Sequence, residues 1–258
     1  MRLALPLLIG AALIAACGGG DEPRRAAPVV AKVAARAESA PPPPPLAIDT
    51  AGDGLLTVWP MAVERNKQAE ETRRLVEHLQ ADLSVVPGFT SATLLASGDG
   101  STLVLAVVWA DSAGAATGDT MLAGWLRLPA DTALRRRHDG TLTSRVAIRR
   151  TTGTPPVLRE GAMVQFTRYV MKPGHSFGAL ATLADSNLAM RVLQDTAAQG
   201  GALLAAADSG ALYMLLQARN ATALDPGFGL PTTSLPFWAP FALREELLMA
   251  VVAIVTRP

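Results

Sequence analysis

The sequence has few of the residues that usually carry chemistry or bind charged partners. Among its 258 residues there is 1 cysteine, so no disulfide can form within the chain and no thiolate cluster can hold a metal. Aromatic residues make up 5% of the chain, too few for the stacking platforms that bind single-stranded nucleic acid. The formal net charge of +1 also gives no electrostatic reason to expect a nucleic-acid partner.

Histidine is scarce as well, and no two of the 3 histidines have metal-ligand spacing. His78 lies in the charged stripe of a predicted helix, where a solvated side chain is expected. His138 follows three arginines, which indicates a basic surface patch or a contact with an anion or headgroup. His175 lies in a predicted turn. The chain has no Gly-x-Ser-x-Gly motif and no phosphate-binding loop. We therefore expect no metal and no cofactor, and no catalytic residue can be named.

The clearest functional signal lies at the N-terminus. Residues 1–16, MRLALPLLIGAALIAA, place one arginine before an apolar run too short to anchor in a bilayer, as in a signal peptide. Ile14-Ala15-Ala16-Cys17 then resembles the lipobox of bacterial lipoproteins. The resemblance implies cleavage before Cys17 and acylation of this residue. An ordinary secretory signal with an incidental cysteine is the alternative.

Lipidation of Cys17 predicts a lipid-anchored protein of the cell envelope, with its folded part in the periplasm. Each buried methylene of an acyl chain contributes about 0.8 kcal/mol to anchoring. Gly18 follows the cysteine, where an aspartate would indicate the inner membrane, so the outer membrane is favoured. Residues 17–47 are rich in Gly, Ala and Pro, which predicts a flexible tether. A ligand for a proline-binding module is the alternative for the polyproline run Pro41–Pro45.

The rest of the chain contains one structural pattern twice. Residues 55–111 and 165–221 each predict a strand, an amphipathic helical segment and a two-stranded hairpin. The strongest helix signal covers Glu64–Ser84, and Ser97-Gly98-Asp99-Gly100 predicts a tight hairpin turn. A closing strand, expected at Thr141–Arg149 in the first copy, completes each pattern.

Each copy therefore has the order β-α-β-β-α-β, which is the ferredoxin-like pattern of an α+β fold. We expect a first domain over residues 48–152 and a second over residues 153–258. Thr151–Pro156, with the sequence TTGTPP, predicts the joint between them.

Short motifs in the first copy resemble the antibiotic biosynthesis monooxygenase (ABM) family. They are Pro87-Gly88-Phe89 after the helix, the Gly-Asp-Gly hairpin and Trp109-Ala110-Asp111-Ser112 after the third strand. In the second copy, Lys172-Pro173-Gly174-His175 resembles the turn that precedes a helix in that family. Family members pair two sheets into a dimeric α/β barrel. Two copies in one chain imply an intramolecular pseudo-dimer, for which a monomer is sufficient.

The family resemblance also directs attention to polar and aromatic residues on the predicted strands. Haem-degrading relatives use an Asn on the first strand and a His on the second helix; Leu55–Trp59 and Asp111–Trp125 contain neither, so that site is not carried over. An inward-facing Arg219, at the position of Trp109 in the first copy, would need a carboxylate or an anionic ligand. Packing in the core is the plain alternative for the aromatic residues. The candidate ligand-pocket residues are Trp59, Trp109, Gln165, Tyr169, Gln217 and Arg219.

Taken together, these patterns predict a lipid-anchored protein with two tandem ABM-like domains. We expect it to bind a small apolar or aromatic molecule without catalysis, or to use the fold as a scaffold. A cofactor-independent monooxygenase that acts on an aromatic substrate is the alternative. A closed apolar cavity with convergent polar groups beneath the sheet would separate these possibilities.

Overall fold

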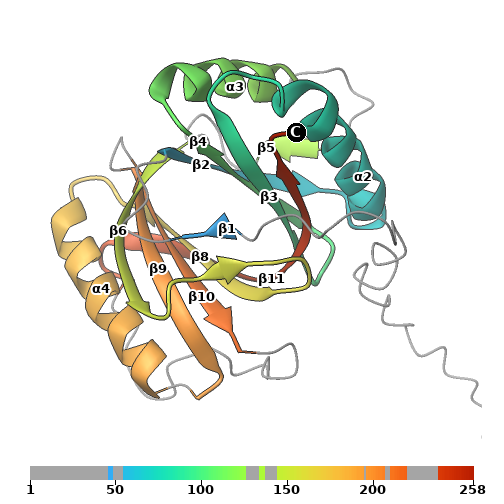
Figure 1. The fold of residues 1–258 in the computed structure, drawn as a ribbon. Helices are drawn as coiled ribbons and strands as arrows, with labels where there is room; N and C mark the ends of the chain where they lie inside the picture. The colour runs from blue at the N-terminus through green and yellow to red at the C-terminus, as the bar shows by residue number, and fades with distance from the viewer. Residues whose placement is uncertain are drawn as a thin grey trace, which may run out of the picture.

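The computed structural model describes residues 46–48, 55–125, 134–136, 144–194, 196–206, 210–219 and 238–258 (Figure 1). The predicted signal peptide, the lipidation site Cys17 and His138 lie outside these residues, so the lipid anchor stays a prediction. Among the helices of the described ranges, none has the length and apolar character needed to cross a membrane.

The first repeat folds into a unit of strands and helices in the predicted order. Its elements are β2 (Leu55–Val63), η1 (Arg65–Lys67), α2 (Gln68–His78), η2 (Leu79–Leu83), β3 (Phe89–Ser97), β4 (Thr102–Trp109), α3 (Ser112–Trp125), β5 (Leu134–Arg136) and β6 (Ser144–Gly153). The final strand differs from the prediction, because β6 continues through residues 151–153 of the expected joint and pairs there with the second unit.

The second repeat follows the same order where it is described. Its elements are β7 (Val157–Leu158), β8 (Met163–Met171), α4 (Phe177–Gln194), β9 (Ala198–Ala206), β10 (Ala211–Ala218) and β11 (Ala242–Thr256). Most of the predicted connection Asp225–Pro240 lies outside the described residues.

Antiparallel ladders join the strands of both units into a ring. The order β4-β3-β11-β8-β10-β9-β6-β2 is closed by pairing of β2 with β4, and β5 extends from β2. The last strand of each unit bridges to the other unit: β11 pairs first with β8 and then with β3, and β6 pairs first with β2 and then with β9. The predicted α+β fold with an intramolecular pseudo-dimeric barrel is therefore confirmed.

One apolar cluster fills the inside of the ring. It draws side chains from both units, among them Val58, Val104, Phe166 and Tyr213. A ring of eight strands is just wide enough for its own side chains to fill. The residual cavity here is about 10 Å³, no more than one water molecule needs. Among the described residues, the barrel interior is therefore a packed core.

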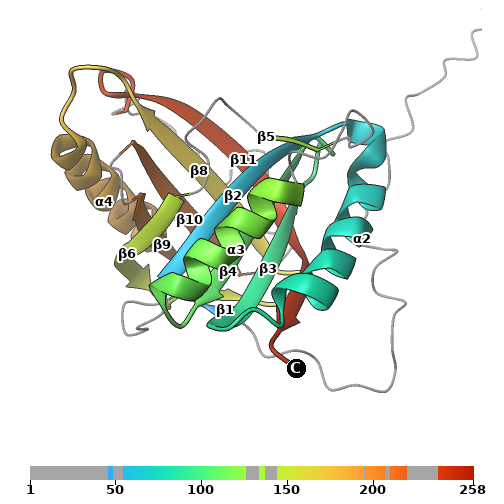
Figure 2. The same cartoon turned by 90° about the horizontal axis from the view of Figure 1, so that it is seen from above.

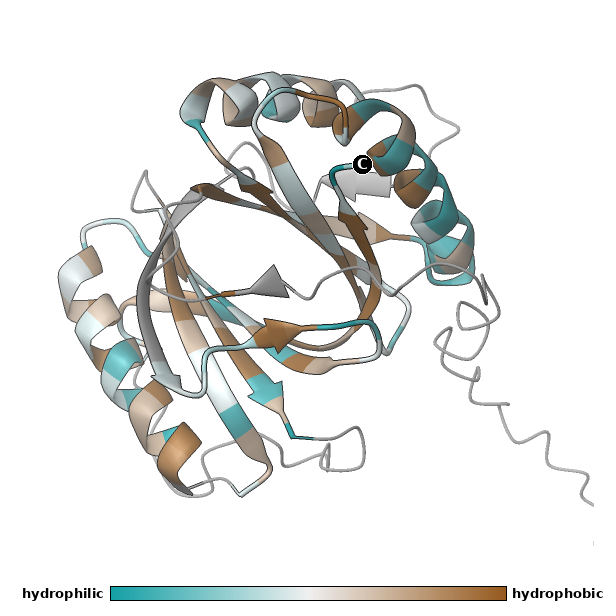
Figure 3. Cartoon of the chain, viewed as in Figure 1, coloured by the Kyte–Doolittle hydropathy of each residue, from teal (hydrophilic) through white to brown (hydrophobic). Residues whose placement is uncertain are grey.

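Helices cover the outer faces of the two units on opposite sides of the barrel. Helices α2 and α3 lie over the first unit, and α4 lies over the second (Figure 2). Leu75 of α2 and Leu79 of η2 face the sheet, while charged residues cover the outer side of α2; Figure 3 shows this contrast, with hydrophilic residues concentrated on α2 and fewer on α4. The sequence pattern of α2 thus determines which face is buried.

A short strand ties the start of the folded chain to the linker between the units. Strand β1 (Leu46–Ala47) pairs with β7, and the Ile48 amide donates to the Pro156 carbonyl at 2.9 Å. The Ile48 side chain is buried in the barrel cluster. Leu46 and Ala47, at the end of the predicted tether of residues 17–47, therefore pair with the folded part of the chain.

Candidate functional site

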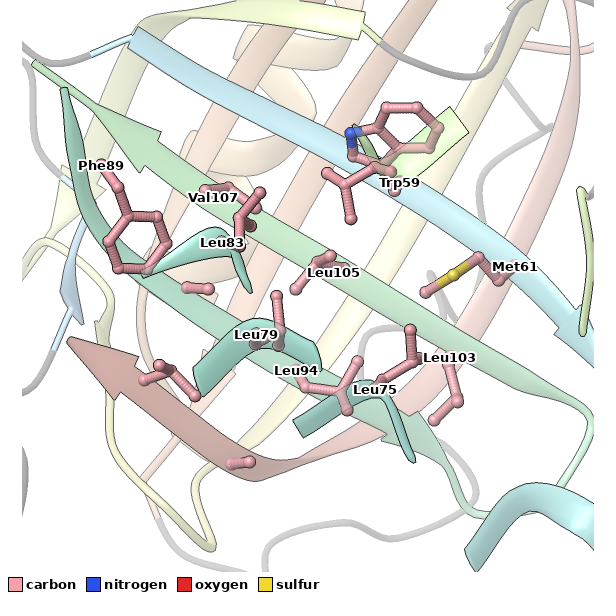
Figure 4. Packing of buried hydrophobic residues seen from close by; sticks show 14 of the residues in the cluster. Trp59, Met61, Leu75, Leu79, Leu83, Phe89, Leu94, Leu103, Leu105 and Val107 are labelled. Atoms are coloured by element: carbon pink, nitrogen blue, oxygen red, sulfur yellow. The ribbon is translucent and has the colours of Figure 1, made fainter. Parts of the chain in front are cut away.

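In the first unit, apolar side chains fill the space between sheet and helices. Leu75, Leu79 and Leu83 point from the helical segment toward the strand residues Leu94 and Leu105 (Figure 4). This is the place where the ABM resemblance leads us to look for a pocket. Among the described residues of this unit, the space is a close-packed core.

The two tryptophans predicted as pocket residues are part of this core. Trp59 and Trp109 are both buried, and the Trp109 indole N–H donates to Thr57 Oγ1 at 3.0 Å. Phe89 meets Trp109 edge to face with ring centroids 5.8 Å apart. A Cβ added to Gly118 of α3 would lie 2.1 Å from the Trp109 ring. No space remains beside this ring for a ligand, which favours the plain alternative of core packing.

The equivalent face of the second unit has its own apolar cluster under α4, and polar side chains lie beside it. We call Gln165, Tyr169, Arg191, Arg244 and Glu246 the polar cluster. They come from β8, α4 and β11, and the register of β8 with β11 places Tyr169 opposite Arg244. Gln165, Tyr169 and Arg191 are buried, whereas Arg244 and Glu246 keep side-chain exposures of 13% and 20%. The cluster therefore reaches the surface at its β11 side.

Hydrogen bonds and an ion pair connect the members of the polar cluster. The Arg191 guanidinium donates to Gln165 Oε1 at 2.9 Å, and the Gln165 amide donates to the Glu246 carboxylate. Glu246 also forms an ion pair with Arg244. Gln165 thus connects the Arg191 guanidinium to the Glu246 carboxylate, and Arg244 lies at the partly exposed side of the cluster, where an anionic group could contact it.

Aromatic rings flank the charged end of the cluster. The Arg244 guanidinium carbon lies 4.2 Å from the centre of a Trp238 ring, within cation–π distance. The Tyr169 and Trp238 rings are 6.3 Å apart. Burial raises the pKa of the Tyr169 phenol, and the nearby Arg244 and Arg191 charges act in the opposite direction without reversing the shift. Tyr169 is therefore a neutral phenol at neutral pH.

Gln217 and Arg219 lie apart from the polar cluster, at one end of the barrel. The Gln217 side chain bonds to both backbone groups of Val157, accepting from its N–H at 2.8 Å and donating to its carbonyl at 2.9 Å. Arg219 follows the last residue of β10 and is exposed, and its Nε donates to the Ala198 carbonyl at 3.0 Å. The inward-facing Arg219 considered from the sequence is thus not found, because the strand ends before it.

An open surface groove of about 550 Å³ lies beside these two residues. Exposed Arg159 and Glu160 also line it. This open groove differs from the closed apolar cavity beneath the sheet that a small-molecule site would require. The six predicted pocket residues are therefore distributed over three places: the first unit's core, the polar cluster and this groove.

The described histidines make local contacts. His78 Nδ1 lies 3.0 Å from an Asp82 carboxylate oxygen, and its ring stacks on Trp125 at 5.0 Å. His175 meets Phe241 edge to face at 5.8 Å. Within the described ranges, no His, Cys, Asp and Glu side chains are grouped to hold a metal ion.

Sequence reasoning missed three members of the polar cluster. Arg244 and Glu246 belong to the charged run Arg244-Glu245-Glu246 in a strand that is otherwise mostly apolar, and Arg191 is one of two charged residues in α4. Charges within otherwise apolar elements are a signal that could have found them, because charges are seldom buried without partners.

Comparisons with known proteins support the fold. No family model and no curated protein matches the sequence. The structure is similar to that of an anthrone oxidase-like protein, with a TM-score of 0.61 and 12% identity over 83% of this chain and 97% of that one. It is also similar to a protein of Fusobacterium nucleatum subsp. nucleatum with a provisional description as a monooxygenase, with a TM-score of 0.50 and 10% identity over 79% and 94% of the two chains. The chain thus has an ABM-like, ferredoxin-type fold.

Proposed function

We propose that this chain is a lipid-anchored protein of the cell envelope that binds a small aromatic ligand at the polar cluster of its second unit. The observation that carries the proposal is that, beside the apolar cluster under α4, connected polar and charged side chains converge and reach the surface at β11. The first unit then serves as structural support for the barrel.

The chemistry of the polar cluster suggests what kind of ligand it takes. Trp238 and Tyr169 offer ring faces, and aromatic pairs gain about 0.5–1.5 kcal/mol beyond their buried area. The Arg244 guanidinium is partly exposed beside Trp238, so an acidic or oxygen-bearing substituent on the ligand would find a donor there. We therefore expect an aromatic ring with a carboxylate or a carbonyl oxygen.

The state of Tyr169 bears on one requirement of the oxygenase alternative. A cofactor-independent oxygenase needs a base to withdraw a proton from its substrate, and the raised pKa leaves Tyr169 protonated. The likeness to an anthrone oxidase-like protein keeps an aromatic oxygenase as the second candidate, with anthrone as its test substrate.

Calorimetry with the full chain in a mild detergent tests the binding proposal. We expect anthraquinone-2-carboxylate to bind with one site per chain and Arg244→Met to weaken its affinity at least about tenfold, since a charge-assisted hydrogen bond contributes about 1.5–3 kcal/mol. Arg159→Met, in the open groove, is the matched control and should leave the affinity unchanged. Loss of affinity in the control alone would place the ligand in the groove and contradict the proposal.

Oxygen uptake with anthrone, in the absence of added cofactor, tests the second candidate. We expect the full chain to consume oxygen no faster than buffer does. Uptake above that level that disappears in Tyr169→Phe would establish the oxygenase instead.

Metabolic labelling with an alkyne-tagged fatty acid in a bacterial host tests the anchor. We expect the full chain to become labelled and the Cys17→Ser variant to remain unlabelled, because Cys17 is the only thiol. An unlabelled parent chain would refute lipidation without bearing on ligand binding.

A further inference from the structure

The outer face of α4 exposes large apolar side chains. Leu183, Met190 and Leu193 are 38%, 50% and 83% exposed. With the exposed Ala179 and Ser186 they form one line along the helix, which we call the α4 stripe. The opposite side of α4, with Leu180, Ala184 and Leu188, packs on the sheet, so this helix is apolar on both faces.

The spacing and charge of the α4 stripe are those of a helix-pairing surface. Its members follow each other at intervals of four, three, four and three residues, as in the seam of a coiled coil. The two charged residues of the helix are turned away from it: Arg191 is buried and Asp185 is half-buried. Helix α2, by contrast, exposes charged residues such as Arg73 and Glu77.

The polar groups of this face already have partners within the helix. The Ser186 hydroxyl donates to the Thr182 carbonyl at 3.1 Å, and the Thr182 hydroxyl donates to the Gly178 carbonyl at 2.9 Å. Covering these hydroxyls with an apolar surface therefore leaves no donor unsatisfied.

Side-chain size changes along the stripe in a way that makes it complementary to itself. Small Ala179 lies at the N-terminal end and large Leu193 at the C-terminal end, with Ser186 midway between them. When two such helices pair antiparallel about Ser186, Leu193 of each copy meets Ala179 of the other, and Leu183 meets Met190. We propose that the α4 stripe is the interface through which two copies of this chain pair, with Ser186 at the two-fold axis.

A second copy fits this surface better than a membrane does. Helices that lie on membranes carry Lys and Arg along their polar side, and α4 exposes neither. The helix spans about 27 Å at 1.5 Å per residue, so one helix pair makes a small interface compared with the roughly 1,200 Å² of stable complexes. The dimer is therefore weak and reversible.

Sedimentation of the full chain in density-matched detergent tests the pairing. We expect a monomer–dimer equilibrium in the micromolar range, with the dissociation constant raised at least about tenfold by Leu193→Glu because each dimer contains two such leucines. The matched control is Val85→Glu, which alters an apolar side chain that is 64% exposed on another part of the surface. A chain that stays monomeric throughout this range, or an equal effect of the control, overturns the proposal.

Oxidative cross-linking tests the geometry. Two copies of Ser186→Cys should form a disulfide-linked dimer, because the two residues meet at the axis. Glu77→Cys, exposed on the charged helix α2, is the control, and the parent chain with its lone Cys17 measures the background. A yield for Ser186→Cys no higher than for Glu77→Cys refutes the antiparallel arrangement.

Discussion

The two units of the barrel have the same strand order but different outer faces. In the first unit, Trp59 and Trp109 pack with leucines from α2 and β3 into an apolar core. In the second unit, Tyr169 stands at the position aligned with Trp59 and lies beside Arg244. The difference teaches that the same strand order can hold charges beside its outer core, because the second unit keeps an apolar cluster under α4 next to the polar cluster.

Substitutions at aligned positions of the two units test this difference most directly. Trp109→Ala should lower the free energy of unfolding by about 3–5 kcal/mol, because it empties a large site in the first core. Arg219→Ala, at the aligned and exposed position, should change it by less than about 0.5 kcal/mol. Urea denaturation followed by circular dichroism measures both. Similar losses for the two variants would show that the units are energetically alike.

A smaller effect is expected from a pair of glycines in α3. Gly118→Ala should cost about 1–3 kcal/mol, since the new methyl group collides with the Trp109 ring. Gly124→Ala meets no atom within 4 Å and should stabilise the chain by up to about 1 kcal/mol through helix propensity. The same denaturation experiment decides the signs. If Gly118→Ala left the free energy of unfolding unchanged, the side chains of the first core could shift to admit added atoms, as those of a ligand pocket must.

The ion pair of the second unit can be tested with a double-mutant cycle. Glu246→Leu alone should cost about 1–2 kcal/mol, because it removes the carboxylate that pairs with Arg244 and accepts from the Gln165 amide. Adding Arg244→Met should recover part of this loss, with a coupling of about 0.5–2 kcal/mol. Additive effects would indicate that the pair is solvated and does not organise the polar cluster.

The smallest expected effect is a decrease in the stability of the folded chain at alkaline pH. The folded chain holds the Tyr169 proton at pH values where the unfolded chain, with a tyrosine pKa of about 10, has lost it. This contribution to stability is fully present below about pH 10 and decreases as the pH rises further, by at most about 1.4 kcal/mol per pH unit. Tyr169→Phe should remove that slope. An unchanged slope between pH 10 and 11 would contradict the buried phenol.

Local signals made most of the fold predictable. The hairpin between β3 and β4 depends on Gly100, which adopts a positive φ of 77°, and on Asp99, whose carboxylate accepts from the Ser101 amide at 3.0 Å. Such turn chemistry is visible in four residues of sequence. The amphipathic pattern of α2 likewise identified its buried side.

The polar cluster could not be predicted in the same way, because it depends on contacts between distant parts of the chain. Gln165 meets Glu246 only because β11 returns to lie beside β8, and meets Arg191 only because α4 packs over that sheet. A sequence pattern reports which face of a strand is buried, but not which charges another element brings to it. Trp109, conversely, is a predicted pocket residue that packs against Gly118 of α3, a contact that the strand pattern alone does not reveal.

The bridging strands β6 and β11 make the two units inseparable parts of one chain, and this has a consequence for stoichiometry. A barrel assembled from two identical chains repeats every substitution in both halves, so any site occurs twice. In this chain, a charge such as Arg244 enters one half only. Each barrel can therefore hold a single binding site while its other half remains free to keep the apolar packing that stabilises both.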